Sequence, residues 1–140
     1  LVVKRKFCIL KDYWRFNIFM NESPVNLTEV KKMLGDNLDL FSSLVDIFTE
    51  ESPSQMDSVE NAIINKDSVS LDNSAHSFKS SLATLGAFEA SSLAAQLEII
   101  GKAGGIDDSA EIFEKLKLEY EKVVSYFESG QWRKDWDNIN

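Results

Sequence analysis

Hydrophobic residues recur every three or four positions along most of this 140-residue chain, which predicts amphipathic helices and not strands. The longest helix is predicted at about Leu38–Asn65. We expect Pro53 to kink or interrupt it, because proline removes a backbone hydrogen bond. A short helix that ends at Leu34 is predicted before it, with Thr28 as the N-cap. Three further helices are predicted, at Leu71–Ala87, Ala90–Gly101 and Ser109–Glu128.

The segments between these helices are short and rich in helix-ending residues. Gly101–Gly105 contains three glycines, but no Gly-Lys-Ser/Thr follows, so we interpret it as a turn and not as a phosphate-binding loop. Asp107 and Asp108 are interpreted as acids at a helix start, since adjacent helical residues diverge and do not form a metal pair. The pattern therefore predicts an all-α fold, an antiparallel up-down-up-down four-helix bundle with a short preceding helix and an N-terminal extension.

The two ends of the chain differ from the middle. Leu1–Met20 has a net charge of +4, whereas the remainder has −12, and its apolar spacing predicts a short amphipathic helix. Such a helix can bind anionic lipid or an acidic partner, but we favour a linker, an extension or a strip packed on its own bundle. We expect residues 1–25 to form this extension, 26–129 the bundle and 130–140 a tail. Trp132 and Trp136 in the tail are expected to cover one end of the bundle, in preference to forming a partner site.

Composition narrows the class of protein. The net charge of −8 argues against nucleic-acid binding, which needs an excess of lysine and arginine. Cys8 is the single cysteine, which excludes an internal disulfide and a cysteine-based zinc site. No apolar run is long enough to span a membrane. The single cysteine fits a reducing compartment, and we expect a cytoplasmic domain. Because the chain begins at Leu1, we expect it to be a fragment of a longer protein.

His76 is the single histidine, and it lies off the apolar stripe of its predicted helix. At about 100° per residue it falls about 140° from the centre of the stripe, so it should face water. Lys79 follows on the same side of the helix, and Asp72, Ser80 and Ala83 are the other helical neighbours. The stripe itself consists of Leu71, Ala75, Phe78, Leu82 and Leu85.

An accessible imidazole beside an ammonium group suits one reaction in particular. A neutral imidazole nitrogen is a nucleophile toward phosphorus, and the nearby ammonium can neutralise the phosphoryl group that it takes up. A lone histidine is more often incidental than functional, but a core histidine would lie on the apolar stripe. The position of His76 therefore favours a function.

The string Ala75-His76-Ser77-Phe78-Lys79-Ser80-Ser81, continued to Gly86-Ala87, resembles the signature of histidine-containing phosphotransfer (HPt) domains of multistep two-component phosphorelays. That signature reads roughly Ala-His-x-Leu-Lys-Gly-Ser-x-x-x-x-Gly-Ala. The match includes the histidine, the lysine, the following serine and the closing Gly-Ala. It departs at Ser80, where the family usually has glycine. The resemblance extends along about Leu27–Glu128.

The resemblance implies a function and roles for single residues. HPt domains accept a phosphoryl group from the aspartyl phosphate of one receiver domain and deliver it to the aspartate of another. His76 would carry the group on Nε2, and Lys79 would help to neutralise it. Glu98, in a Leu-Glu pair like one often found in the family, would orient the imidazole. The family also implies a four-helix bundle, which the periodicity predicts independently.

The same resemblance bears on partners and cofactors. Response-regulator receiver domains would dock transiently on the patch around His76, with Asp72, Ser80 and Ala83 as contacts, and we expect a monomer. No nucleotide-binding segment is present, so we expect a phosphohistidine carrier and not an enzyme. No cofactor or metal is expected in this chain, because the magnesium that supports transfer belongs to the receiver. Whether the chain is a free relay or part of a hybrid sensor kinase stays open.

Two alternatives remain from the sequence. The first is the dimerisation and phosphoacceptor domain of a histidine kinase, but the usual His-Glu/Asp-x-x-x-Pro pattern is absent after His76. The second is a helical interaction module in which the histidine is incidental and partners bind Leu1–Met20 or the tryptophan tail.

Overall fold

The computed structural model describes residues 23–139 of the chain, and the expectations for Leu1–Met20 lie outside these described residues. The described part consists of helices joined by short connections and contains no strand, as predicted. Its helices are α2 (Leu27–Leu34), α3 (Leu38–Ile64), α4 (Ser68–Thr84), α5 (Phe88–Ala103), the short 3₁₀ helix η1 (Ile106–Asp108), α6 (Ser109–Ser129) and α7 (Gln131–Asp137).

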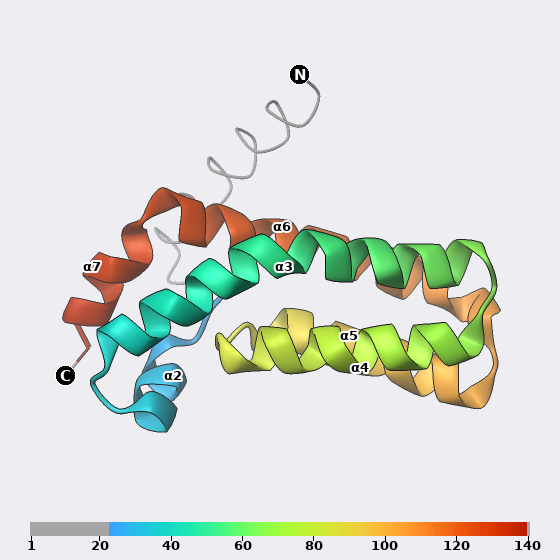
Figure 1. The fold of residues 1–140 in the computed structure, drawn as a ribbon, viewed down its shortest axis with the longest axis horizontal. Helices are drawn as coiled ribbons and strands as arrows, with labels where there is room; N and C mark the ends of the chain where they lie inside the picture. The colour runs from blue at the N-terminus through green and yellow to red at the C-terminus, as the bar shows by residue number, and fades with distance from the viewer. Residues whose placement is uncertain (1–22, 140) are drawn as a thin grey trace, which may run out of the picture.

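The four long helices α3 to α6 form a bundle in which successive helices run in opposite directions (Figure 1). Each packs against the next one in the chain, and α3 also contacts α6, which closes the bundle. The short helices α2 and α7 lie together at one end (Figure 1). The predicted all-α bundle is therefore confirmed.

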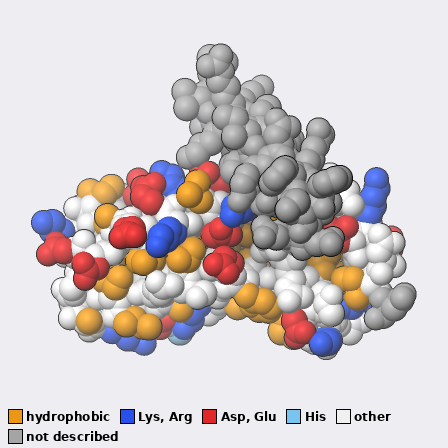
Figure 2. All heavy atoms as spheres, turned by 180° about the vertical axis from the view of Figure 1, so that it is seen from behind, with side chains coloured by type: hydrophobic (Ala, Val, Ile, Leu, Met, Phe, Trp, Pro, Cys, Tyr) orange, Lys and Arg blue, Asp and Glu red, His pale blue; other side chains and the backbone are white. Residues whose placement is uncertain are grey.

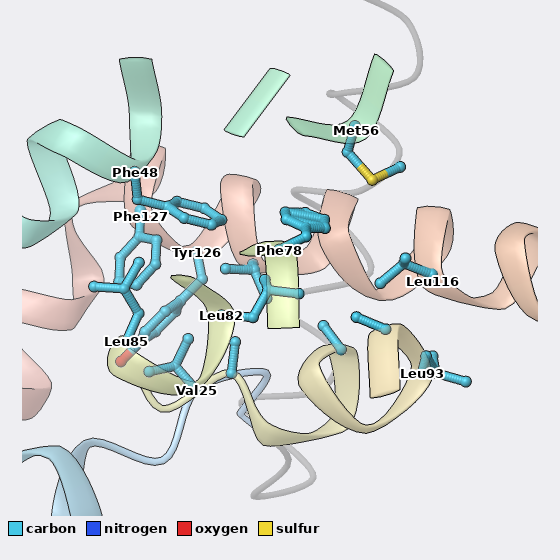
Figure 3. Packing of buried hydrophobic residues seen from close by; sticks show 14 of the residues in the cluster. Val25, Phe48, Met56, Phe78, Leu82, Leu85, Leu93, Leu116, Tyr126 and Phe127 are labelled. Carbon is cyan, nitrogen blue, oxygen red and sulfur yellow. The ribbon is translucent and has the colours of Figure 1, made fainter. Parts of the chain in front are cut away.

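The core is built from the apolar stripe of each helix. Phe78 and Leu82 of α4 are fully buried, as the stripe predicted, and the Phe78 ring packs edge-on against Tyr120 of α6 with centroids 5.7 Å apart. Figure 3 shows Phe78 and Leu82 in the same cluster as Phe48 of α3 and Phe127 of α6. Such burial is the main source of stability in a domain of this size. It also leaves the opposite face of α4 free for function.

Helix α7 covers one end of the bundle with its two tryptophans. The Trp136 ring stacks on Phe41 of α3 with centroids 5.2 Å apart, and Trp132 meets the same ring edge-on at 5.4 Å. Each indole N–H donates a hydrogen bond, Trp132 to the Phe127 carbonyl at 3.2 Å and Trp136 to Asp36 at 3.3 Å. Both side chains are buried, so the predicted cover over the bundle end is confirmed.

Several predicted helix boundaries were wrong, because other polar residues supply the caps. Asn26, not Thr28, caps α2, and its side chain accepts a hydrogen bond from the Glu29 amide. Asp67 caps α4 in the same way, so the helix that holds His76 starts three residues earlier than predicted. Asparagine and aspartate are the stronger N-caps, whereas the prediction followed the apolar spacing.

The other differences lie at breakers and loops. Helix α3 continues through Pro53 without interruption, although it changes direction along its length, as an internal proline favours (Figure 1). Helix α5 runs on to Ala103, so the predicted glycine turn is confined to Gly104 and Gly105. Asp108 makes no capping hydrogen bond, because the chain forms the 3₁₀ helix η1 before α6. Helix α4 ends at Thr84, just before Gly86, whose φ of 77° no other residue adopts easily.

The surface is mixed in charge. Figure 2 shows acidic and basic side chains interspersed with apolar ones on the face opposite to that of Figure 1. None of the helices in residues 23–139 has the length and hydrophobicity needed to cross a membrane.

Candidate functional site

His76 lies on the solvent-facing side of α4. Its side chain is 61% exposed, while its neighbours Ala75 and Phe78 are fully buried in the core. The prediction that the imidazole faces water is therefore confirmed. A residue at this position can meet a partner without any opening of the bundle.

The imidazole is held from one side by Glu98 of α5. Nδ1 of His76 lies 2.9 Å from Glu98 Oε1, a hydrogen-bond distance. An ionised carboxylate can only accept hydrogen bonds, so Nδ1 is the nitrogen that carries the proton. In the neutral ring, Nε2 is then left with a free lone pair. The contact thus fixes both the ring's tautomer and its direction.

Glu98 is a buried carboxylate with two cations in addition to the histidine. Its side chain is 7% exposed, and its oxygens accept hydrogen bonds from Lys79 Nζ at 2.6 Å and from Lys102 Nζ at 3.1 Å. The hydrogen bond from Lys79, followed by those from His76 and Lys102, lowers the pKa of Glu98 to about 2 against the opposing effect of burial. Glu98 is therefore an anion over the whole physiological pH range.

The site depends on a close approach of α5 to α4. Gly101 lies so near α4 that a Cβ atom there would come within 2.5 Å of the Asp72 backbone nitrogen. Asp72 lies one helical turn before His76 on α4, so this contact is close to the histidine. Further along, the Ser91 hydroxyl of α5 donates a hydrogen bond to the Lys79 carbonyl at 3.0 Å. These two contacts set the distance between the helices on both sides of Glu98.

The predicted docking residues lie along α4 on either side of His76. Asp72 and Ala83 are half-buried and Ser80 is exposed. The Ser80 hydroxyl donates to the His76 carbonyl at 3.2 Å, so the side chain folds back on its own helix. The serine that replaces the family's usual glycine therefore leaves the imidazole uncovered on this side.

Sequence reasoning missed two residues of the site. Lys102 was not considered, although its position four residues after Glu98 is a spacing that places an acid and a base side by side on a helix. Gly101 was interpreted only as the end of a helix, whereas the structure places it inside α5 at a helix contact. Within the described residues, no group of three or more histidine, cysteine, aspartate or glutamate side chains is arranged to hold a metal ion.

Comparison with known proteins agrees with this geometry. The family model of the Hpt domain matches residues 43–126, more than half of the chain. The chain belongs to the Hpt domain family. It is therefore a histidine phosphotransfer carrier of the phosphorelay type, and receiver domains of response regulators are its partners. This assignment favours a phosphorelay carrier over the kinase dimerisation domain and the helical interaction module that the sequence left as alternatives.

The fold of this Hpt domain is similar to that of a solved family member. Histidine-containing phosphotransfer protein B (HptB) from Pseudomonas aeruginosa PAO1 superposes with a TM-score of 0.60 at 21% sequence identity. The match covers 75% of this chain and 90% of that protein. No curated protein sequence gives a significant match. At this identity the likeness shows a shared fold.

The first prediction concerns the helix contact at Gly101. Gly101→Ala should destabilise the domain by about 1–3 kcal/mol, because the new methyl group meets the α4 backbone. This loss should outweigh the gain of about 1 kcal/mol that alanine brings inside a helix. Urea unfolding measures the difference. Gly105→Ala is the matched control, since a Cβ there meets nothing within 4 Å, and equal stability of both variants would contradict the close contact.

The second prediction concerns acid stability. The folded-state pKa of Glu98 is about 2, below the ordinary value of 4.5, so its ionisation stabilises the fold fully above about pH 4.5. That contribution is lost as the pH falls from 4.5 toward 2. Glu98→Gln should therefore lower the free energy of unfolding at pH 7, and the difference from wild type should shrink over this interval. Urea unfolding at a series of pH values tests this.

Glu111→Gln is the control for that titration. Glu111 also pairs with a lysine four residues later, Lys115 at 3.5 Å, but its side chain is 80% exposed. An exposed pair of this kind contributes little to stability. If both variants showed the same pH dependence, the buried ion-pair cluster would not be the source of the effect.

Proposed function

We propose that His76 is the phosphoacceptor of this Hpt domain and that it carries the phosphoryl group on Nε2. The observation that supports this most directly is the Glu98 contact, which occupies Nδ1 and leaves Nε2 free. The side chain is 61% exposed, so a receiver's active site can reach it. No other residue of the chain offers an imidazole.

The transfer step follows from ordinary phosphorus chemistry. The Nε2 lone pair of His76 attacks the phosphorus of a receiver's aspartyl phosphate, so an N–P bond forms. The P–O bond to the aspartate breaks, and the aspartate leaves as a carboxylate. Because Nδ1 keeps its proton, the ring gains positive charge during the attack, and the Glu98 carboxylate faces that charge. The reverse reaction delivers the group to a second receiver.

Lys79 supplies charge on the phosphoryl side in this proposal. It lies three residues after His76 on α4, and its side chain is one-third exposed. In the unphosphorylated protein its ammonium group is 2.6 Å from Glu98 Oε2. It must therefore exchange part of this contact for the phosphoryl oxygens when the group arrives. Magnesium would be supplied by the receiver, whose aspartate it serves, and not by this chain.

The docking surface is the strip of α4 formed by Asp72, His76, Ser80 and Ala83. These residues are four, four and three positions apart, so they share one face of the helix. Small side chains on this strip let a receiver approach the imidazole closely. A small patch of this kind suits a transient complex of monomers, which a relay needs in order to release one receiver and bind the next.

The third prediction tests the phosphoacceptor. The wild-type chain and His76→Gln are incubated with phosphoramidate, a small phosphoryl donor, and with receivers carrying labelled aspartyl phosphate and magnesium. We expect acid-labile, alkali-stable label on the wild type and none on the variant. The reason is that the N–P bond of a phosphohistidine is cleaved by acid and withstands alkali. Circular dichroism confirms that both are folded. Equal labelling of His76→Gln would refute the proposal.

The fourth prediction tests the docking strip. Ala83→Trp should slow transfer from a receiver by about tenfold or more. A large side chain two turns from His76 would keep the receiver's aspartyl phosphate away from the imidazole. Labelling by phosphoramidate should stay the same, since this small donor needs no docking surface. Ala110→Trp is the control, an exposed alanine near the start of α6. Unchanged receiver transfer in Ala83→Trp would exclude this contact.

A further inference from the structure

The three hydrogen-bond donors of Glu98 are divided unequally between its two oxygens. Oε1 accepts from His76 Nδ1 at 2.9 Å and from Lys102 Nζ at 3.1 Å. Oε2 accepts from Lys79 Nζ at 2.6 Å. Lys102 therefore shares its oxygen with the histidine, while Lys79 binds the other oxygen.

This division matters when the phosphoryl group arrives. A phosphoryl group on Nε2 carries close to two negative charges and would attract the ammonium of Lys79, which lies three residues after His76 on the same helix. As Lys79 moves toward it, Glu98 loses the donor on Oε2. A carboxylate that is 7% exposed cannot replace that donor fully with water, so its ionised form is disfavoured. A neutral Glu98 would no longer hold the proton on Nδ1 or balance the charge on the ring.

We propose that Lys102 is a positioning residue, which keeps Glu98 ionised and bound to His76 Nδ1 while Lys79 turns to the phosphoryl group. The inference rests on the proposed function of His76. Lys102 does not touch the reacting atoms and acts through Glu98. Its ammonium group is well placed for this, because it binds the same oxygen that accepts the Nδ1 proton.

The backbone favours this arrangement. Lys102 directly follows Gly101, the residue at which α5 approaches Asp72 of α4. The backbone of Lys102 is therefore close to the turn of α4 that precedes His76. The hydrogen bond and charge of Glu98, followed by the charge of Asp72, raise the pKa of Lys102 and keep it protonated. Lys102 also lies four residues after Glu98, in the favourable order of an acid before a base.

The test compares Lys102→Met with wild type before and after phosphorylation by phosphoramidate. Nitrogen-15 chemical shifts of the His76 ring report which nitrogen carries the proton. In Lys102→Met, we expect the unphosphorylated ring to keep the Nδ1–H tautomer, since Lys79 still holds Glu98. In the phosphorylated form, the Nδ1 proton signal should weaken, and the equilibrium for transfer from a receiver should fall by about two- to fivefold, the range of an exposed ion pair.

A double variant separates this role from a general effect of charge. If Lys102 replaces Lys79 as the partner of Glu98, the double variant Lys79→Met, Lys102→Met should lose the Nδ1–H tautomer even when unphosphorylated, although each single variant keeps it. Lys102→Arg retains the positive charge and should restore wild-type behaviour. Lys115→Met is the matched control, because Lys115 is exposed to a similar degree, 57% against 62%, and also pairs with an acid four residues before it.

The outcomes distinguish the two proposals. If wild-type His76 takes no phosphoryl group, the proposed function fails, and this inference fails with it. If His76 is phosphorylated but Lys102→Met behaves like Lys115→Met in both states, only the role of Lys102 is refuted. A tautomer in the double variant equal to that of the wild type would also overturn it.

Discussion

The hydrogen bond between Glu98 and His76 is the contact on which the site depends. It joins a buried carboxylate on α5 to an exposed imidazole on α4, so one end lies in the core and the other faces solvent. The Glu98 carboxylate is held in one orientation, because it is buried and both of its oxygens accept hydrogen bonds. Exposure leaves Nε2 available. A histidine buried as deeply as Glu98 would be rigid but inaccessible. Without Glu98, the ring could turn freely about its side-chain bonds, and neither tautomer would be favoured by a fixed acceptor.

The packing of α5 on α4 places the Glu98 carboxylate beside His76 in addition to burying the core. A buried ion pair is weak evidence for a stable fold, because removing charges from water costs about as much as their attraction returns. The core residues of α4, such as Phe78 and Leu82, supply the stabilising burial on the opposite face. Gly101 is a poor residue for the inside of a helix, yet it permits the close approach that brings Glu98 and Lys102 to the histidine. The low helix propensity of Gly101 is thus a local loss of stability that accompanies the placement of the Glu98 carboxylate beside His76.

The sequence predicted the scaffold well because the scaffold follows periodicity. The stripe from Leu71 to Leu85 specified which face of α4 is buried, and the exposure of His76 followed from that alone. Boundaries were less certain because caps depend on side-chain geometry, as Asn26 and Asp67 show. Glu98 could be proposed only through the family resemblance, since no helical wheel states how α5 is rotated against α4. Lys102 was missed because it follows from Glu98: once Glu98 is placed, the i,i+4 spacing within α5 indicates the pair.

The division of charge at Glu98 also bears on how a carrier can be reversible. A relay must hold its phosphoryl group firmly enough to survive between partners, but loosely enough to release it. If Lys79 bound nothing in the resting state, its full attraction would add to the stability of the phosphorylated form. Because it is already paired with Glu98 at 2.6 Å, only the difference between two ion pairs would be gained if His76 were phosphorylated as proposed. If His76 is the phosphoacceptor, as proposed, the resting contact would moderate the energy of the phosphohistidine, and this small difference would favour exchange with a receiver in either direction.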